Sequence, residues 1–401
     1  MSTTASQSGT TSYDNRVATP DVSSAPRARI ASLDIVRGAV MVLMAIDHVR
    51  VFAGVPTSGP PEIFFTRWVT HFCAPIFIFL AGTAAYLYGA KVQSRSKLSK
   101  FLLVRGLWLV LLELTLLRFG WTFNFDYASF TFAGVIWAIG WSMVVLSALV
   151  YLPTSVVTAI GVVITVGHNA IAPLVYSIEE PSWILRVLYA GGDFPVGSGI
   201  NVVVLYVLVP WIGVMAAGYG FGTIMKASPE KRRRFCLGVG SAAIALFILL
   251  RATGIYGDPR PWTSELGVLP FLNPAKYPAS LAFLLMTLGP MMIAIALLEN
   301  ARGRIARWLG VFGQVPFFYY VLHIPLIHIT AVLVSLVRTP ESTGWLVANH
   351  PMMPPDVPAG YQWSLPLLYL VTAIIVTVLY FVCRWYARVK AESGSWLLKL
   401  L

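Results

Sequence analysis

Apolar residues recur along this chain in stretches of about 20, separated by short polar segments. A helix needs about 20 apolar residues to cross the roughly 30 Å hydrocarbon core of a bilayer. The pattern therefore predicts an all-α, polytopic integral membrane protein with about ten membrane-spanning helices. The expected spans cover residues 31–53, 68–90, 101–119, 131–151, 153–175, 201–223, 235–253, 279–298, 308–336 and 364–386.

Two places leave nine or eleven spans open. A very short turn must separate two helices at Leu152-Pro153, and residues 181–190 would also suit an extra helix at the membrane surface. Residues 1–28 are rich in Ser, Thr and Ala and contain no apolar segment, so we expect a disordered cytoplasmic tail rather than a cleaved signal peptide. The remainder, 29–401, is expected to form one transmembrane domain with short loops.

Composition supports a membrane protein. Of 401 residues, 57% are hydrophobic and 11% are charged, whereas a soluble domain has about 25% charged residues. A water-soluble fold would be unable to bury so much apolar surface. The chain is therefore expected to have the lipid bilayer as its solvent.

The distribution of basic residues predicts the orientation of the chain. The formal charge of +12 is compatible with nucleic-acid binding, but cytoplasmic loops of membrane proteins also carry excess Lys and Arg. The expected inner loops hold Lys91, Arg95, Lys97, Lys100, Lys226, Lys231, Arg232, Arg233, Arg234, Arg302, Arg304 and Arg307. The longer outer loops hold Arg67, Arg186, Arg260, Lys276 and Arg338. We therefore expect both termini in the cytoplasm and no nucleic-acid partner.

The first span carries ionisable residues on one helical face. At 100° per residue, Asp34, Arg37, Met41, Met44 and His48 lie on the same side. A charge in a membrane span costs a few kcal/mol, so each one is a functional candidate. With the N-terminus inside, Asp34 and Arg37 lie toward the cytoplasm, and His48 lies about 16 Å farther out. Alternatively, Asp34 and Arg37 form an intrahelical ion pair that supports assembly, and His48 only donates to a neighbouring carbonyl.

Further candidates lie in other spans. His71 and His323 suit proton transfer at neutral pH, although each could be a structural histidine. Arg105, near the inner end of the third expected span, is either an anion ligand or a side chain that extends to the membrane surface. Glu113, deeper in that span, requires a cation from another helix or a proton.

The histidines do not predict a metal site. No pair has the spacing of a metal-binding motif, and His323 and His328 are five residues apart, which places them about 140° apart around a helix. No Gly-rich phosphate loop, nucleophile elbow or dinucleotide fingerprint occurs. We expect no metal cofactor, and neither NTP hydrolysis nor hydride transfer is supported.

The chain resembles a known family at its first two spans. The residues that carry the resemblance are Arg29, Ser32-Leu33-Asp34, Arg37-Gly38 and Phe77-Ile78-Phe79-Leu80-Ala81-Gly82. They resemble the start of the heparan-α-glucosaminide N-acetyltransferase catalytic domain and its bacterial relatives. The bacterial relatives also resemble Val209–Ala216, Lys276-Tyr277-Pro278, Phe312–Pro316 and Leu322-His323-Ile324-Pro325. The resemblance implies that 29–401 is an acyltransferase-like domain in a bacterial plasma membrane.

The first span is also similar to the acyltransferase-3 family. In that family an Asp, an Arg three residues later and a His eleven residues after the Arg open the first helix, as Asp34, Arg37 and His48 do here. Such families are thought to transfer an acyl group from cytoplasmic acyl-CoA to an acceptor, often a sugar, on the far side of the membrane. The resemblance thus implies acetyl-CoA or another acyl-CoA as cosubstrate and a sugar or glycan as acceptor. The sequence leaves both a monomer and a homodimer possible.

These implications assign roles to the candidate residues. His48 would accept a proton from the acceptor hydroxyl or amine, and His71 and His323 would act as a proton relay or as an acyl carrier. Arg29, Arg37 and Arg105 would hold the CoA phosphates, with Asp34 orienting Arg37. The alternative is a transporter whose buried charges form a proton or substrate path, although no internal repeat is visible in the sequence.

Overall fold

The computed structural model describes residues 30–197, 199–349 and 357–393. The chain divides into two units, Met1–Ile30 and Ala31–Leu401, and only the second is described below. The expected tail 1–28 and the candidate Arg29 lie outside the described residues. Their predicted roles therefore stay predictions.

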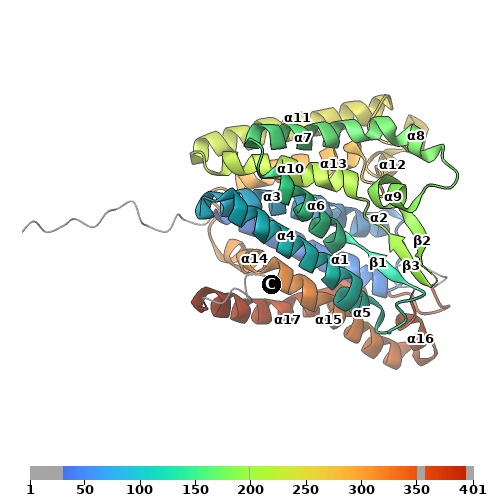
Figure 1. Ribbon diagram of the computed structural model, residues 1–401. Helices are drawn as coiled ribbons and strands as arrows, with labels where there is room; N and C mark the ends of the chain where they lie inside the picture. Colours follow the sequence, from blue (N-terminus) through green and yellow to red (C-terminus); the bar gives the residue numbers. More distant parts are fainter. Residues whose placement is uncertain (1–29, 198, 350–356, 394–401) are drawn as a thin grey trace, which may run out of the picture. The chain divides into compact units, whose positions relative to one another are not determined.

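A long helix lies in each of the ten ranges that the apolar pattern predicts (Figure 1). These helices are α1 Ala31–Phe52, α3 Cys73–Val92, α4 Arg95–Leu112, α6 Val135–Leu149, α7 Thr154–Gly167, α10 Leu208–Met225, α11 Pro229–Thr253, α13 Leu281–Leu297, α15 Pro316–Arg338 and α17 Leu365–Glu392. In the described part, six helical stretches are long and apolar enough to cross a membrane: Pro61–Val92, Thr154–Tyr176, α10, α11, α15 and α17. The protein is a mainly helical integral membrane protein.

Shorter helices extend or connect the long ones. The α-helices are α2 Pro61–Trp68, α5 Arg118–Thr122, α8 Ala172–Tyr176, α9 Trp183–Leu185, α12 Val268–Phe271, α14 Arg304–Gln314 and α16 Thr343–Leu346. The 3₁₀ turns are η2 Val69–Phe72, η4 His168–Ile171, η6 Ser264–Leu266 and η7 Pro340–Ser342, and the π-helical turns are η3 Glu113–Leu117 and η5 Arg186–Ala190. The turn at Leu152-Pro153 does separate α6 from α7, and the segment 181–190 is helical from Trp183 to Ala190.

One predicted span is divided in two. The range 308–336 contains the end of α14 and most of α15, with Val315 between them at φ −134° and ψ 50°. The ring of Pro316 disfavours a helical conformation at the residue before it, and a proline is well tolerated at the first position of a helix. Pro316 therefore ends one helix and begins the next.

The structure also contains a small sheet that the all-α prediction did not include. The strands are β1 Thr131–Ala133, β2 Gly192–Val196 and β3 Ile200–Val204, in the order β1-β3-β2. β1 runs parallel to β3, and β2 runs antiparallel to it. The β-branched run at the end of β3 favours a strand at the start of the predicted span 201–223, and β1 pairs with it at the start of the predicted span 131–151.

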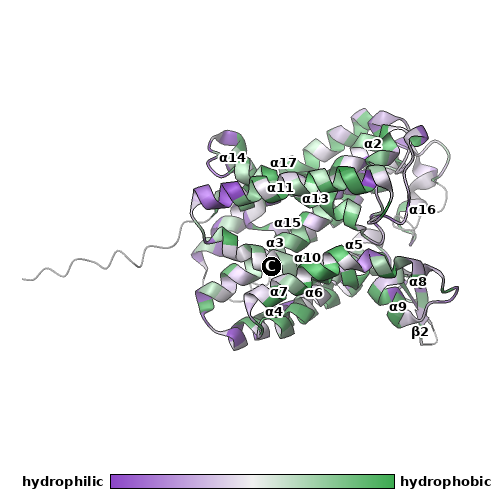
Figure 2. Cartoon of the chain, turned by 90° about the horizontal axis from the view of Figure 1, so that it is seen from above, coloured by the Kyte–Doolittle hydropathy of each residue, from purple (hydrophilic) through white to green (hydrophobic). Residues whose placement is uncertain are grey.

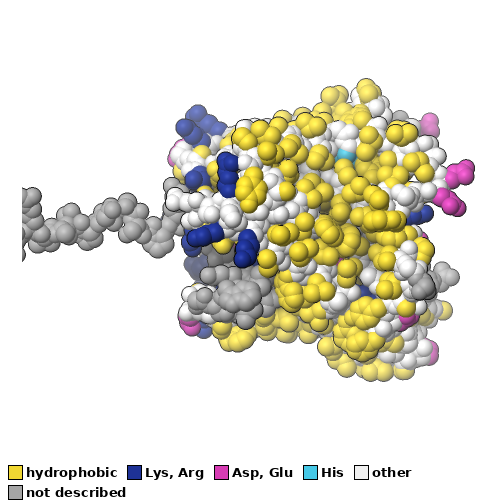
Figure 3. Space-filling view, in the orientation of Figure 1, with side chains coloured by type: hydrophobic (Ala, Val, Ile, Leu, Met, Phe, Trp, Pro, Cys, Tyr) yellow, Lys and Arg dark blue, Asp and Glu magenta, His cyan; other side chains and the backbone are white. Residues whose placement is uncertain are grey.

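The outer helices expose apolar side chains. Large hydrophobic residues are exposed along α7 (Val163), α11 (Leu249) and α17 (Phe381). Figure 2 shows long helices that are hydrophobic over most of their length. In Figure 3 a broad hydrophobic surface separates an end where Lys and Arg gather from an end where Asp and Glu gather. This surface has the composition of one that faces lipid.

Helix α1 lies at the centre of the helical packing and contacts α3, α13, α14, α15 and α17. Glycines bring α1 and α14 close together. A Cβ at Gly313 would lie 1.9 Å from the backbone oxygen of Asp34, and one at Gly38 would lie 1.9 Å from that of Leu309. Small residues permit such close helix packing in membranes. The candidate face of α1 thus depends on the fit with α14.

This packing makes a testable prediction. Gly313→Ala should lower the stability of the protein by roughly 1–3 kcal/mol, because the backbone carbonyl of Asp34 blocks the new methyl group. Gly310→Ala on the same helix is the matched control, since a Cβ there meets no atom within 4 Å. Thermal unfolding in detergent measures both variants. Equal unfolding temperatures for the two variants would show that α1 and α14 have room for the methyl group, which would contradict the close contact between them.

Candidate functional site

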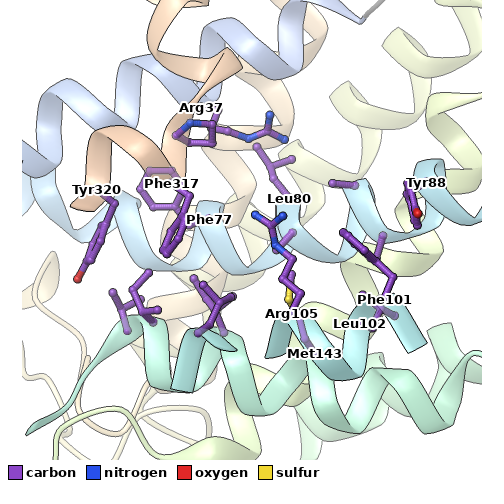
Figure 4. A pocket seen from close by; sticks show the side chains of 18 of the residues that line it. Arg37, Phe77, Leu80, Tyr88, Phe101, Leu102, Arg105, Met143, Phe317 and Tyr320 are labelled. Atoms are coloured by element: carbon purple, nitrogen blue, oxygen red, sulfur yellow. The ribbon is translucent and has the colours of Figure 1, made fainter. Parts of the chain in front are cut away.

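A cavity of about 300 Å³ lies between α1, α3, α4, α6 and α15. Its wall is mostly apolar, with contributions from Phe77, Leu109 and Phe317. Two cations, Arg37 from α1 and Arg105 from α4, also line it. Figure 4 shows both side chains reaching into the same part of the cavity from opposite sides. We call it the inner cavity.

The orientation of Arg37 is fixed by α1 and α14. Its Nη1 lies 3.3 Å from Oδ1 of Asp34 and donates to the backbone oxygen of Gly313 at 3.2 Å. Asp34 is buried and does not line the cavity. The i, i+3 ion pair considered for this face is therefore present, and it holds Arg37 at the cavity wall.

A second cavity, of about 620 Å³, lies beyond the inner one. Its wall is more polar and includes Asp47, His48, Arg50, Arg67, Tyr206 and Tyr277. We call it the outer cavity. Val135 and Tyr320 line both cavities, so the two spaces meet at these residues. Arg37 and His48 therefore lie in two adjoining cavities along one helix.

His48 and His323 are in direct contact. Nδ1 of His48 lies 2.6 Å from Nε2 of His323, and Nδ1 of His323 lies 2.6 Å from the backbone oxygen of Tyr320. A carbonyl only accepts, so Nδ1 of a neutral His323 carries the proton and its Nε2 accepts. His48 then donates from Nδ1, and its Nε2 keeps a lone pair. No described residue hydrogen-bonds to Nε2 of His48, which lines the outer cavity.

The other histidine candidates are placed differently. His323 is fully buried, and both of its ring nitrogens are engaged. His71 is buried against Phe283, lines neither cavity, and has no partner for Nδ1 within the described ranges. His328 stacks on Phe123. The structure thus brings His323 to His48 and leaves His71 away from the cavity walls.

An ion cluster beside His48 was missed in the sequence. Asp47 binds Nε of Arg50 at 3.0 Å and Nη1 of Arg67 at 3.5 Å. Arg67 comes from α2, whereas the sequence indicates only an outer-loop cation at this position. The i, i+3 spacing of Asp47 and Arg50 was a usable signal, but Asp47 lies off the face that carries Asp34, Arg37 and His48.

Glu113 has a partner of a different kind from those expected. Its Oε2 accepts from the backbone N–H groups of Ile136 at 2.8 Å and Trp137 at 3.2 Å, at the N-terminus of α6. Unpaired amides and the helix dipole there favour a negative charge. Glu113 therefore anchors α6, whose first residues, Val135 and Ile136, line the inner cavity.

Two tyrosines from loops complete the outer cavity. The hydroxyl groups of Tyr206 and Tyr277 are 3.5 Å apart. Burial raises the pKa of Tyr206 well above its ordinary value. At Tyr277 burial also opposes ionisation, but Lys276 and Arg67 outweigh it and lower the pKa. The cations at this cavity therefore create a positive potential.

The described residues contain no group of three or more His, Cys, Asp and Glu side chains that could hold a metal ion. The expectation of no metal cofactor stays a prediction. The cavity walls instead offer cations for an anionic ligand and an imidazole nitrogen for a proton.

Comparison with known proteins identifies the family. The family profile described as heparan-alpha-glucosaminide N-acetyltransferase, catalytic, matches residues 29–256, which is more than half of the chain. No curated protein matches the chain. The matched range contains Asp34, Arg37, His48 and Arg105, while His323 lies beyond it. The chain belongs to the heparan-alpha-glucosaminide N-acetyltransferase catalytic-domain family, which indicates a membrane acyltransferase.

Proposed function

We propose that this protein transfers an acyl group, most simply acetyl, from cytoplasmic acyl-CoA to a sugar or glycan acceptor on the outer side of a bacterial plasma membrane. The observation that carries the proposal is that two cavities meet at Val135 and Tyr320, one with cations and the other with the available nitrogen of His48. The family match supports acyl transfer as the reaction class.

The proposed topology has ten spans and both termini in the cytoplasm. It is supported by the ten long helices and by the gathering of Lys and Arg at one end of the described unit (Figure 3). In this orientation Arg37 and Arg105 lie toward the cytoplasm, and His48 lies about 16 Å farther along α1. The inner cavity then receives the donor and the outer cavity receives the acceptor.

The donor would enter the inner cavity with its phosphates beside Arg37 and Arg105. Guanidinium groups bind phosphate oxygens through strong, charge-assisted hydrogen bonds. Asp34 positions Arg37 through the 3.3 Å ion pair. Arg29 stays a proposed phosphate contact. The apolar wall between the cations and Tyr320 suits the acyl-bearing arm of the cosubstrate, whose thioester would reach the junction of the cavities.

His48 is proposed as the general base. Its Nε2 takes the proton from the acceptor hydroxyl or amine as the acceptor oxygen or nitrogen forms a bond to the thioester carbon. The carbon–sulfur bond then breaks, and the CoA thiolate takes that proton from His48. The products are an acyl ester or amide and the CoA thiol. General-base catalysis of this kind contributes about 10²- to 10⁴-fold in rate.

His323 is proposed as a positioning residue for His48. Since Nδ1 of His323 faces two backbone carbonyls, its Nε2 accepts from His48 and directs the lone pair of His48 toward the cavity. The buried His323 offers no open nitrogen to an acyl group. We therefore favour this role over an acyl carrier or relay, and the position of His71 supports neither.

One observation also favours the transporter alternative. Cavities that approach from the two ends of α1 and meet at Tyr320 would suit a solute path as well as a reaction site. The two functions differ in consumption of acyl-CoA. A transporter moves its solute without releasing CoA thiol.

Binding of acetyl-CoA to the detergent-purified protein tests the donor site. We expect saturable binding in calorimetry, and Arg105→Gln should raise Kd about tenfold, because it removes a charged phosphate ligand. Arg233→Gln is the matched control, since Arg233 is an exposed cation in the first turns of α11 that lines neither cavity. S-acetylpantetheine, which lacks the nucleotide phosphates, should bind equally to all three proteins. Failure of the folded parent to bind any acyl-CoA would contradict the proposal.

Variants of the histidine pair test the chemistry. With glucosamine as a trial acceptor, His48→Ala should reduce release of CoA thiol by about 10²- to 10⁴-fold. His323→Gln should retain more activity than His323→Leu, because an amide oxygen can still accept from Nδ1 of His48. The pH profile of His323→Leu should also shift. If the Gln and Leu variants had equal activity and the parental pH profile, His323 would not position the base.

A further inference from the structure

The described residues that line the outer cavity carry a surplus of positive charge. Among them Asp47 is the one acid, whereas Arg50 and Arg67 are both cations. The acceptor of the proposed transfer would occupy this cavity. The ion pairs that these cations form therefore determine how much positive charge remains to bind an acceptor.

Asp47 is shared by the two arginines. Arg50 is the closer partner, at 3.0 Å through Nε, and its Nη1 also donates to the backbone oxygen of Val55 at 2.8 Å. Arg67 lies 3.5 Å from the second carboxylate oxygen and donates to Thr70 at 2.9 Å, both through Nη1. Arg67 also forms a side-chain hydrogen bond with Tyr277. A guanidinium group carries five N–H donors, more than these contacts use. Arg67 therefore retains donors for a ligand.

A third cation, Lys276, packs against a residue that lines the outer cavity. Lys276 is buried, and its Nζ lies 5.1 Å from the centre of the Tyr277 ring, which lines the cavity. No carboxylate of a described residue lies within ion-pair distance of Lys276. Three cations against one shared carboxylate leave about two positive charges uncompensated at this partly buried site.

Uncompensated charge in a buried site is unfavourable, and an anion from outside relieves it. A carboxylate matches the planar fork of a guanidinium and can accept two of its hydrogen bonds. The hydroxyl groups of Tyr206 and Tyr277, 3.5 Å apart, add polar contacts of the kind that sugar hydroxyls require. The lowered pKa of Tyr277 agrees with a positive potential at this wall.

We propose that the outer cavity binds an acidic sugar, with a carboxylate of the acceptor held by Arg67 and the nearby cations. This proposal rests on the proposed function and specifies the class of its acceptor. The acid group fixes the sugar beside His48, so that a hydroxyl or amine elsewhere on it faces Nε2. A neutral sugar lacks that contact and binds more weakly.

A matched pair of probes tests the proposal. They are the methyl glycosides of galacturonic acid and of galactose. The two differ only at C6, which is a carboxylate in galacturonic acid and a hydroxymethyl group in galactose. Calorimetry with the detergent-purified parent should give a Kd for the acid that is about tenfold lower than for the neutral sugar. In Arg67→Gln this preference should disappear. In Arg67→Lys, which keeps the charge and loses the fork, it should be intermediate.

Arg338→Gln is the matched control, because it removes an exposed cation that does not line the cavity. It should keep the parental preference. Equal affinity of the parent for the two sugars, binding of neither, or an unchanged preference in folded Arg67→Gln would overturn the proposal. The probes require no acyl-CoA, so acid-selective binding without acetyl-CoA binding would retain this site and reject acyl transfer.

Discussion

The cost of placing an ionisable side chain in hydrocarbon governs the arrangement of helices around α1. Each such group needs a partner, and the partners come from different elements. Arg37 donates to Gly313 at the end of α14, Asp47 binds Arg67 from α2, and His48 contacts His323 from α15. These contacts hold three separate segments against one helix. The same requirement that stabilises the packing therefore brings polar groups together at the cavities.

Much of the fold could be predicted from apolar periodicity, because crossing a bilayer requires a fixed length of apolar helix. The strands β1 and β3 could not be predicted this way, since a run such as Asn201-Val202-Val203-Val204 is equally apolar as a strand or as the start of a span. Pro316 was a readable signal for the break between α14 and α15. Apolar residues on both sides of the proline nevertheless favour a single span in the sequence pattern.

The candidate site was predicted in part. The face shared by Arg37 and His48 follows from helical geometry, and both residues line cavities. The partner of His48 could not be predicted, because His323 is 275 residues away and periodicity carries no information about which helices pack together. Glu113 was expected to find a cation or a proton, and its hydrogen bonds from backbone amides have no sequence signature.

We propose above all that a donor bound at Arg37 and Arg105 presents its thioester to the acceptor activated by Nε2 of His48. A cryo-EM structure of the protein with a non-reactive thioether analogue of acetyl-CoA tests it most directly. We expect the nucleotide beside Arg105 and the carbonyl carbon of the analogue at the junction near Tyr320. The space between that carbon and Nε2 of His48 should accommodate the hydroxyl or amine group of an acceptor. A nucleotide bound in the outer cavity, or an acyl group remote from His48, would contradict the account.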